Sequence, residues 1–283
     1  MTPEVISTVA AMRLRIREQR AQGHSIGVVP TMGALHTGHG VLIDHAVEGS
    51  DYVVVTIFVN PIQFDRKEDF ERYARNLESD VAFCAKRGVH AVFAPAPEEM
   101  YPRPQLTFIE VTGVQDHLCG QYRPGHFRGV ATVVAKLFNV VAPDRAWFGE
   151  KDAQQLAVIQ RMVADLNMPV EVVPVATVRE PDGLAMSSRN QRLSPEERRI
   201  APILYKALSA AQRTIASGNR DAAAVQEAAM QVLGRESAVR VEYVEVADAF
   251  SMTPVVQIDG PVRIAGAVWI GGTRLIDNVY CEV

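Results

Sequence analysis

Short apolar, β-branched stretches alternate with helix-period stretches along most of the first 175 residues of this 283-residue chain. The strand-like runs are residues 26–29, 52–59, 91–94, 146–148 and 170–175. Between most of them lie the helix-period segments 41–47, 77–86, 130–141 and 154–167. This alternation is typical of a parallel sheet with helices on both faces. We therefore predict a Rossmann-like, doubly wound α/β fold.

The pattern changes after Val178. A helix begins sharply with Ser194 as its N-cap, Pro195 at its first position and Glu197 completing a capping box. We expect this helix to run to about Ser217, where a Gly-Asn pair ends it.

A second helix is predicted over 221–234, and short strands follow it. These strands are expected at 239–246, 262–264, 267–270 and 274–278. Two helices followed by an antiparallel group indicate a second, smaller α+β domain. We predict a Rossmann-like, ligand-binding domain over residues 1–186 and a C-terminal α+β lid domain over 187–283.

Composition narrows the class of protein. The formal net charge is −4 and the pI is about 6.0, which argues against a general nucleic-acid-binding surface. The three cysteines are scattered without a C-x-x-C pair, so neither a disulfide framework nor a zinc cluster is expected. The longest apolar runs are strand-sized, and the N-terminus lacks a signal-peptide core. We predict a cytoplasmic protein with no membrane or nucleic-acid partner.

Residues 28–39 (VVPTMGALHTGH) read as strand, glycine turn and helix start. His36 and His39 are three residues apart, near the first turn of the helix, and so share one face. A helix start offers free backbone N–H groups and the positive end of the helix dipole, which attract phosphate. Two histidine donors beside them suit a phosphorus centre that gains negative charge during displacement.

Gln63 follows the second predicted strand, in the segment NPIQF. Its amide can both donate and accept, which suits a substrate with hydroxyl and carboxylate groups. From the residue alone, a solvated glutamine after a proline turn is an equal alternative. The carboxyl ends of parallel strands meet at one edge of a sheet, where ligands bind, so this turn and the histidine turn are expected to converge.

Two basic segments remain ambiguous from composition. Residues 123–130 (RPGHFRGV) form either a mobile flap that brings cations to an anionic ligand or an ordinary surface loop that leads into the next helix. Lys151 and Asp152 follow a glycine turn, where they either contact phosphate and ribose or form a charged turn.

Residues 186–189 (MSSR) lie at the expected domain junction. Two hydroxyls and an arginine fork suit a polyphosphate clamp, and a polar linker before a capped helix is the alternative. Clefts between domains commonly bind ligands, which favours the clamp.

Five segments of the chain, in order and at matching separations, resemble the pantothenate synthetases, or pantoate–β-alanine ligases. This family belongs to the HIGH-motif nucleotidyltransferase superfamily, which is related to class I aminoacyl-tRNA synthetases. The matching segments are 29–39, 58–64, 123–130, 148–156 and 179–190. The likeness covers nearly the whole length.

The resemblance implies an ATP-dependent ligase. In this family the pantoate carboxylate attacks the α-phosphate of ATP, giving pantoyl adenylate and pyrophosphate. The amine of β-alanine then attacks the adenylate, giving pantothenate and AMP. The resemblance also implies a requirement for Mg²⁺ and a homodimer. The direct ligands of Mg²⁺ stay open, since phosphate oxygens can supply most of them.

Carried over to matching positions, the resemblance assigns catalytic roles to His36, His39, Lys151, Ser187, Ser188 and Arg189. His39 is the implied proton donor, and His36 assists on the phosphates. The implied contacts of ATP are Met32, Gly33, Ala34, Leu35, His36, Thr37, Gly38, His39, Gly149, Glu150, Lys151, Asp152, Val178, Met186, Ser187, Ser188 and Arg189. Gln63 and Gln155 are the implied pantoate ligands, with Gln63 also near β-alanine.

Two positions depart from the expected pattern. Ala74 stands where the family commonly has proline, and Gly40 lowers helix propensity by ~1 kcal/mol at a helix start.

Two other classes of protein are alternatives to the ligase. One is a cytidylyltransferase-type enzyme that ends at a nucleotide-linked product, and the other is a nucleotide-binding module without catalysis. AMP formation that depends on β-alanine distinguishes the ligase from both.

Overall fold

The computed structural model describes residues 2–65 and 67–283 of the chain, which form two compact units. Unit 1 comprises Met1–Val111, Arg123–Glu150 and Val158–Ala176. Unit 2 comprises Thr112–Tyr122, Lys151–Ala157 and Thr177–Val283. The boundary expected between residues 186 and 187 stays a prediction.

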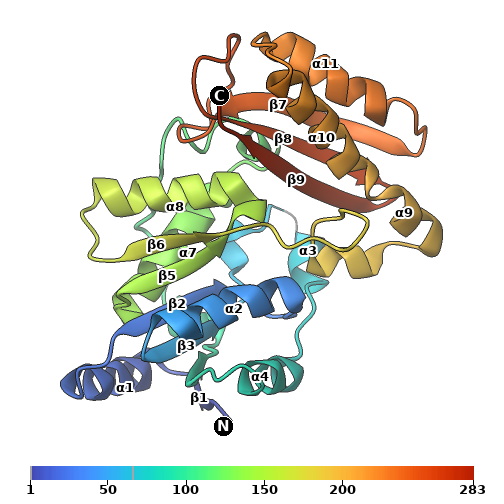
Figure 1. Cartoon of the computed structure of the whole chain (residues 1–283). Helices are drawn as coiled ribbons and strands as arrows, with labels where there is room; N and C mark the ends of the chain where they lie inside the picture. Colours follow the sequence, from blue (N-terminus) through green and yellow to red (C-terminus); the bar gives the residue numbers. More distant parts are fainter. Residues whose placement is uncertain (1, 66) are drawn as a thin grey trace. The chain divides into compact units, whose positions relative to one another are not determined.

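The sheet of unit 1 has six strands among the described residues, in the order β1-β4-β3-β2-β5-β6, and all its pairs are parallel (Figure 1). The strands are β1 (Glu4–Ile6), β2 (Ile26–Thr31), β3 (Tyr52–Ile57), β4 (Ala91–Phe93), β5 (Arg145–Gly149) and β6 (Glu171–Val175). The predicted parallel α/β fold is confirmed. The three-residue strand β1 was not predicted from the sequence.

Helices flank this sheet. They are α1 (Val9–Ala21), α2 (Thr37–Gly49), α3 (Lys67–Glu71), α4 (Leu77–Ala85), α5 (Pro97–Met100) and α7 (His126–Val141). Val29, Val53 and Val55 of the central strands pack in one core cluster with Ile43 and Ala46 of α2, and all five are fully buried. Apolar side chains repeated at helical spacing therefore fix α2 on the sheet, and with it the turn that precedes the helix.

Unit 2 contains a three-stranded antiparallel sheet, in the order β7-β8-β9, among the residues described. Its strands are β7 (Val239–Asp248), β8 (Val262–Ile270) and β9 (Thr273–Cys281). The helices are α6 (Cys119–Tyr122), α9 (Pro195–Ile200), α10 (Ile203–Ala216) and α11 (Ala222–Leu233). Helices α10 and α11 lie side by side and contact the sheet (Figure 1). Helix α8 (Ala153–Asp165) contributes residues to both units.

The capping box at the start of α9 is confirmed. The backbone N–H of Glu197 donates to Ser194 Oγ at 3.3 Å, and Ser194 N–H donates to Glu197 Oε2 at 2.7 Å. The prediction of one continuous helix to Ser217 is wrong, because α9 ends at Ile200 and α10 begins at Ile203. Pro202 separates them, since proline has no N–H for the helical ladder.

The predicted break between strands 262–264 and 267–270 is also wrong, because both belong to β8. Gly266 lies inside this strand and contacts α10 closely. A Cβ at Gly266 would lie 3.0 Å from Leu204 Cδ1. This glycine therefore marks close packing of a helix on the strand and does not end it.

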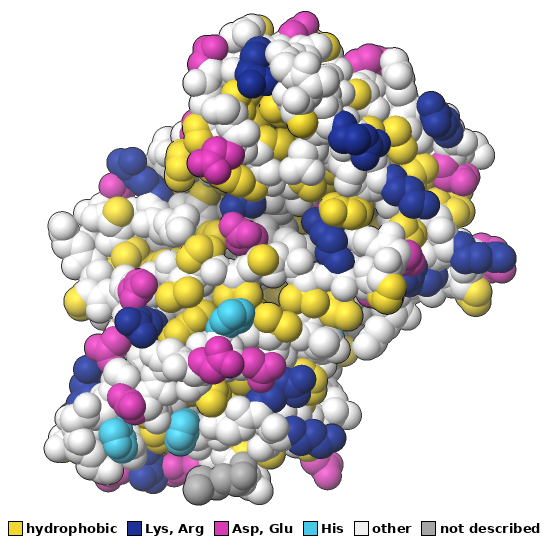
Figure 2. Space-filling model, viewed as in Figure 1, with side chains coloured by type: hydrophobic (Ala, Val, Ile, Leu, Met, Phe, Trp, Pro, Cys, Tyr) yellow, Lys and Arg dark blue, Asp and Glu magenta, His cyan; other side chains and the backbone are white. Residues whose placement is uncertain are grey.

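Figure 2 shows acidic and basic side chains mixed over the face in view.

Cys84, Cys119 and Cys281 are free thiols and are all buried. Burial raises the pKa of Cys84 to about 12. None of the helices formed by residues 2–65 and 67–283 combines the length and the hydrophobicity needed to cross a membrane.

Candidate active site

The turn between β2 and α2 is held by one buried carboxylate. Asp80 of α4 accepts the backbone N–H of Ala34 on Oδ2 at 3.0 Å and that of Leu35 on Oδ1 at 2.8 Å. Gly33 has a φ of +82°, and a Cβ there would lie 2.8 Å from Asp80 Oδ2. The turn therefore needs glycine both for its backbone conformation and for the approach of the carboxylate.

Sequence reasoning missed Asp80. Burial raises the pKa of this carboxyl, although the two backbone N–H donors oppose the rise. Asp80 lies four residues before Cys84 on the buried face of α4. An acidic residue on the apolar face of a predicted helix was the available signal, because a buried carboxylate requires hydrogen-bond partners.

The structure brings the two predicted histidines together at the start of α2. Their ring centroids are 4.1 Å apart. His36 is the N-cap, and its Nδ1 accepts the N–H of Gly38 at 3.1 Å, while His39 Nδ1 accepts the N–H of His36 at 3.3 Å. These contacts assign the proton of each neutral ring to Nε2. Each imidazole thus carries one N–H donor that the helix cap does not use.

Gly40, which departs from the expected helix pattern, has a packing reason. A Cβ at this position would lie 2.7 Å from the guanidinium nitrogens of Arg87. Arg87 also contacts Asp44 of α2 at 3.4 Å and stacks on the ring of Phe83. The glycine therefore leaves room for an arginine that joins α4 to α2.

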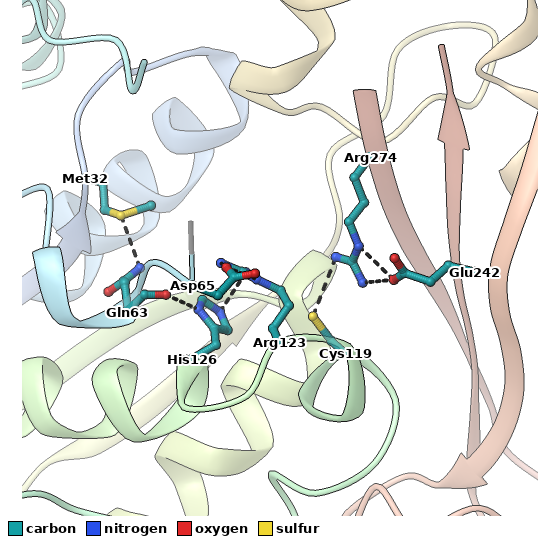
Figure 3. Close-up of polar contacts among 8 residues, drawn as sticks. All are labelled: Met32, Gln63, Asp65, Cys119, Arg123, His126, Glu242 and Arg274. Carbon is teal, nitrogen blue, oxygen red and sulfur yellow. Dashed lines mark hydrogen bonds and ion pairs between the residues drawn. The ribbon is translucent and has the colours of Figure 1, made fainter. Parts of the chain in front are cut away.

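Gln63 is buried, with 7% exposure, so it is not a solvated glutamine. It ends the short helix η1 (Pro61–Gln63) after β3. Its Oε1 accepts from Asn60 Nδ2 at 3.0 Å, and its Nε2 donates to Met32 Sδ at 3.1 Å (Figure 3). A thioether is a weak acceptor, so a substrate oxygen can replace it as the partner of Nε2.

Gly129 allows helix α7 to approach this amide. A Cβ at Gly129 would lie 2.5 Å from the carbonyl oxygen of Ile62 and 2.6 Å from Gln63 Cα. The Gly129 carbonyl itself accepts from Asn60 Nδ2 at 3.1 Å. The second glycine of the RPGHFRGV segment therefore serves a backbone-to-backbone contact beneath Gln63.

The segment 123–130 is not simply a loop before a helix at Val130, as the sequence suggested. Helix α7 begins at His126, because Gly125 caps it with a φ of +77°. His126 Nδ1 donates to the Gln63 carbonyl at 2.8 Å, and its Nε2 accepts from Arg123 Nη1 at 3.0 Å (Figure 3). An arginine cannot accept, so this ring is neutral with its proton on Nδ1.

The two arginines of this segment both face carboxylates. Arg123 contacts Asp65 Oδ1 at 3.2 Å, and Arg128 contacts Glu110 Oε1 at 3.6 Å. Burial raises the pKa of Asp65, but the charge and hydrogen bonds of Arg123 outweigh this and leave that pKa below its usual value. Both guanidinium groups thus pair with carboxylates of unit 1, and the flap that brings cations to an anionic ligand stays a prediction.

In unit 2, Lys151 lies in the short helix η2 (Glu150–Asp152), which follows β5. Its Nζ is 3.9 Å from Asp152 Oδ2, and its side chain is 16% exposed. Its carbonyl accepts from Asn278 Nδ2 of β9 at 3.1 Å. Neighbouring Gln154 is buried and donates to the carbonyls of Val114 and His117. The predicted ligand Gln155 is half-buried.

Val178 and Met186, both predicted contacts of ATP, are adjacent in the structure. The Met186 N–H donates to the Val178 carbonyl at 2.9 Å, which closes a tight hairpin with Gly183 at a φ of +95°. Ser187 then caps the short helix η3 (Ser188–Arg192), because its Oγ accepts the N–H of Arg189 at 3.3 Å. This segment is therefore structured and is not an open linker.

A buried ion pair anchors this hairpin to β9. Arg179 Nη1 lies 2.6 Å from Asp277 Oδ2, whose side chain is 3% exposed. Burial raises the pKa of Asp277, and the charge of Arg179 opposes this rise. The adjacent Asn278 accepts from Arg263 at 2.7 Å and holds the Lys151 carbonyl. Sequence reasoning missed both β9 residues, although two polar residues in a row within an apolar strand were a visible signal.

Each unit thus contributes part of the predicted set. Unit 1 holds the histidine turn and Gln63, and unit 2 holds Lys151, Gln155 and residues 186–189. Helix-start N–H groups, imidazole donors and a lysine are suited to bind phosphate and to stabilise negative charge on it. Among the described residues, no group of three or more His, Cys, Asp or Glu side chains is arranged to hold a metal ion.

Known proteins resemble this chain over nearly its whole length. The model of the pantoate–β-alanine ligase family matches residues 4–280. The pantothenate synthetase of Moorella thermoacetica is 52% identical over 280 residues, which cover 99% of this chain and 99% of that protein.

Solved structures give the same result. The pantothenate synthetase from Thermus thermophilus superposes with a TM-score of 0.92 at 45% identity, covering 98% of each chain. A pantoate–β-alanine ligase from Francisella tularensis, complexed with β,γ ATP and β-alanine, gives a TM-score of 0.79 at 31% identity over 98% of this chain and 97% of that one. These matches confirm the predicted resemblance, and the chain belongs to the pantoate–β-alanine ligase family.

Proposed function

We propose that this chain condenses pantoate with β-alanine at the expense of ATP, through a pantoyl adenylate, and releases AMP and pyrophosphate. The observation that carries the proposal is the start of α2. There, two neighbouring imidazoles each carry a proton on Nε2 beside a helix N-terminus, in a chain that the family model matches over residues 4–280. Such a cluster of donors suits a phosphate that gains charge.

In the first step the pantoate carboxylate displaces pyrophosphate from the α-phosphate. Negative charge builds on the phosphorus oxygens and on the leaving group, so positioning and electrostatic stabilisation supply most of the catalysis. His36 and His39 donate to phosphate oxygens in this proposal, with His39 as the proton donor. The backbone of residues 32–38 lies along the phosphates.

Gln63 is proposed to bind pantoate through its Nε2 donor. The Oε1 side of this amide is engaged by Asn60, whereas its Nε2 donor contacts the weak acceptor Met32 Sδ. A carboxylate or hydroxyl oxygen of pantoate is a stronger acceptor than this thioether and can replace it. Gln155 is proposed as the second amide on pantoate.

The proposed ATP contacts of unit 2 supply positive charge and hydroxyl donors. Lys151 and Arg189 neutralise phosphate charge, and Ser187 and Ser188 donate hydrogen bonds. Asp152, together with Gly149 and Glu150 at the end of a unit 1 segment, contacts the nucleotide beside Lys151. Val178 lies at the adenine end, and Met186 is a further contact beside Ser187. The backbone hydrogen bond between Val178 and Met186 keeps these two residues adjacent.

Mg²⁺, the cytoplasm and a homodimer complete the proposal. Mg²⁺ commonly keeps phosphate oxygens and water as ligands, so its proposed requirement does not demand a cage of protein carboxylates. The scattered, unpaired cysteines suit a reducing compartment. Sedimentation equilibrium tests the homodimer, which a monomer at micromolar concentration would contradict.

Pantoate-dependent exchange of pyrophosphate into ATP tests the first step. We expect His39→Ala and Lys151→Ala each to lower the exchange rate by about 10²–10³-fold, the usual cost of removing one donor to transition-state charge. Matched controls are His45→Ala, an exposed histidine on the same helix, and Lys206→Ala on α10, both expected at the wild-type rate. Near-wild-type exchange in His39→Ala or Lys151→Ala would reject the role of that residue.

The second step separates the ligase from the two other classes. A ligase forms AMP only when β-alanine follows pantoate, and each turnover then yields one pantothenate. An enzyme that stops at a nucleotide-linked product, or a module that only binds ATP, shows no AMP formation that depends on β-alanine.

A further inference from the structure

The amide of Asn60 lies at the centre of a buried chain of hydrogen bonds in unit 1. Asn60 is 1% exposed. Its Nδ2 donates to the Gly129 carbonyl at 3.1 Å and to Gln63 Oε1 at 3.0 Å. Its Oδ1 lies 2.7 Å from the hydroxyl of Tyr101. Both polar atoms of the Asn60 side chain therefore have hydrogen-bond partners.

The direction of each bond follows from its partners. A backbone carbonyl only accepts, so the Asn60 atom that faces Gly129 is the NH₂ group. The same NH₂ then faces the carbonyl end of the Gln63 amide, and the Asn60 oxygen must accept from Tyr101. Tyr101 thus fixes the orientation of the Gln63 amide through Asn60, and the Nε2 donor of Gln63 is directed at Met32.

Tyr101 is built as a fixed donor at the end of this chain. It follows α5, and its N–H donates to the Pro97 carbonyl at 2.7 Å. Its ring lies beside Phe58, with centroids 6.1 Å apart, and Lys136 Nζ lies 4.8 Å over the ring centre. Burial raises the pKa of its hydroxyl, which therefore keeps its proton.

We propose that Tyr101 is a positioning residue for pantoate: its hydroxyl fixes the Asn60 amide, which in turn holds Gln63 with Nε2 toward the substrate. This inference rests on the proposed role of Gln63 as a pantoate ligand. Tyr101 itself acts only through Asn60 and Gln63.

Loss of the hydroxyl has a specific consequence. Without its donor, the buried Oδ1 of Asn60 is unsatisfied, and the Asn60 amide loses one of the contacts that fix its position. Its NH₂ group then holds the carbonyl end of Gln63 less firmly, so Nε2 is directed less well at a substrate oxygen. An interaction made equally in the ground state and the transition state changes KM without kcat, so the effect belongs in the KM for pantoate.

The test is Tyr101→Phe in the exchange assay, which keeps the ring, its contact with Phe58 and the nearby Lys136. We expect the KM for pantoate to rise about tenfold, while the KM for ATP and the maximal exchange rate stay within about twofold of wild type. Tyr52→Phe is the matched control, because Tyr52 is a buried tyrosine at the opposite end of β3. An unchanged KM for pantoate in Tyr101→Phe overturns the inference.

A double-mutant cycle removes the alternative of a merely structural role. In an Asn60→Ala background, we expect Tyr101→Phe to change the KM for pantoate by less than about twofold. The hydrogen bonds from Tyr101 through Asn60 to Gln63 are already lost in that background. Equal effects of Tyr101→Phe in both backgrounds overturn the inference. Asn60→Asp is a second route, because it keeps the acceptor for Tyr101 but removes the donor to Gln63. It must also raise the KM for pantoate.

Gln63→Leu separates this inference from the function on which it rests. An unchanged KM for pantoate in Gln63→Leu rejects the role of Gln63, and the inference falls with it. A raised KM in Gln63→Leu beside an unchanged KM in Tyr101→Phe rejects the inference alone.

Discussion

The surroundings of Gln63 in unit 1 and those of β9 in unit 2 hold polar side chains by different kinds of interaction. The direct hydrogen bonds of Gln63 and Asn60 join neutral groups: an amide, a phenol hydroxyl, a backbone carbonyl and a neutral imidazole. Beside β9 they are ion pairs. Arg179 pairs with Asp277, and Arg274 pairs with Glu242 beside the Cys119 thiol (Figure 3).

The difference separates binding geometry from stability. Neutral hydrogen bonds are directional, and each contributes only about 1 kcal/mol net, so their loss mainly misdirects a donor. A buried ion pair is costly to break, because the remaining charge stays buried without its partner. Substitutions around Gln63 are therefore expected to change substrate KM most, and those beside β9 to change the free energy of unfolding most.

Breaking the buried pair gives the largest expected effect. We expect Arg179→Ala to lower the free energy of unfolding by about 3–5 kcal/mol in urea denaturation, because Asp277 loses its partner. Arg199→Ala is the matched control. Its pair with Glu196 has side chains 76% and 71% exposed, so we expect a change below about 1 kcal/mol. Equal losses in the two variants would erase the distinction between the pairs.

Gly129→Ala tests whether close backbone contact directs Gln63. The added Cβ would lie 2.5 Å from the Ile62 carbonyl oxygen, so the backbone must move. We expect the free energy of unfolding to fall by about 3 kcal/mol and the KM for pantoate to rise. Gly260→Ala is the control, because nothing lies within 4 Å of its added Cβ. A wild-type KM for pantoate in folded Gly129→Ala would count against this role.

Asp80→Asn sharpens the comparison from within unit 1, where one carboxylate holds two backbone N–H groups. The amide has one acceptor oxygen, so one N–H loses its partner. We expect the free energy of unfolding to fall by about 2 kcal/mol and the KM for ATP to rise. The control is Asp44→Asn, an exposed acid on α2. Asp80→Asn with an unchanged KM for ATP would show that the turn holds its shape unaided.

The smallest effect is expected at Asp182, whose carboxylate pairs with Arg198 at 2.6 Å near the surface of unit 2. The hydrogen bond from Arg198 lowers the pKa of Asp182. A lowered folded-state pKa contributes stability above the unfolded pKa of about 3.9, and this contribution is lost as pH falls through the folded pKa. We expect Asp182→Asn to lower the free energy of unfolding by at most about 1 kcal/mol at pH 7, and by progressively less below pH 4, in urea denaturation. A constant difference from pH 7 to pH 2 would contradict this.

Much of the fold was predictable because hydrophobic period differs between strands and helices. The other five strands of the parallel sheet and the capped start of α9 were found in this way. Strand β1 was missed because only one of its three residues is buried, whereas all three residues of the equally short β4 are buried and form an apolar run. The break at Pro202 was missed because the apolar pattern continues across it, although the missing N–H interrupts the helix.

The candidate site was predictable where its residues are contiguous, as in the histidine turn. The residues that hold the site were not. Asp80 contacts the turn across 46 residues, Tyr101 contacts Asn60 across 41, and Arg179 contacts Asp277 across 98. No local spacing encodes such contacts, which depend on strand order and on the packing of helices.

The burial of all three thiols has a practical consequence. A buried thiol reacts slowly with alkylating reagents, and burial also raises the pKa of Cys84 and that of Cys281, so the native chain offers little background for labelling. Cysteines introduced at exposed Glu48 on α2 and exposed Gln231 on α11 would carry paired spin labels, one in each unit. Electron-spin distances recorded with and without ATP would then test whether ATP changes the separation of the two labels.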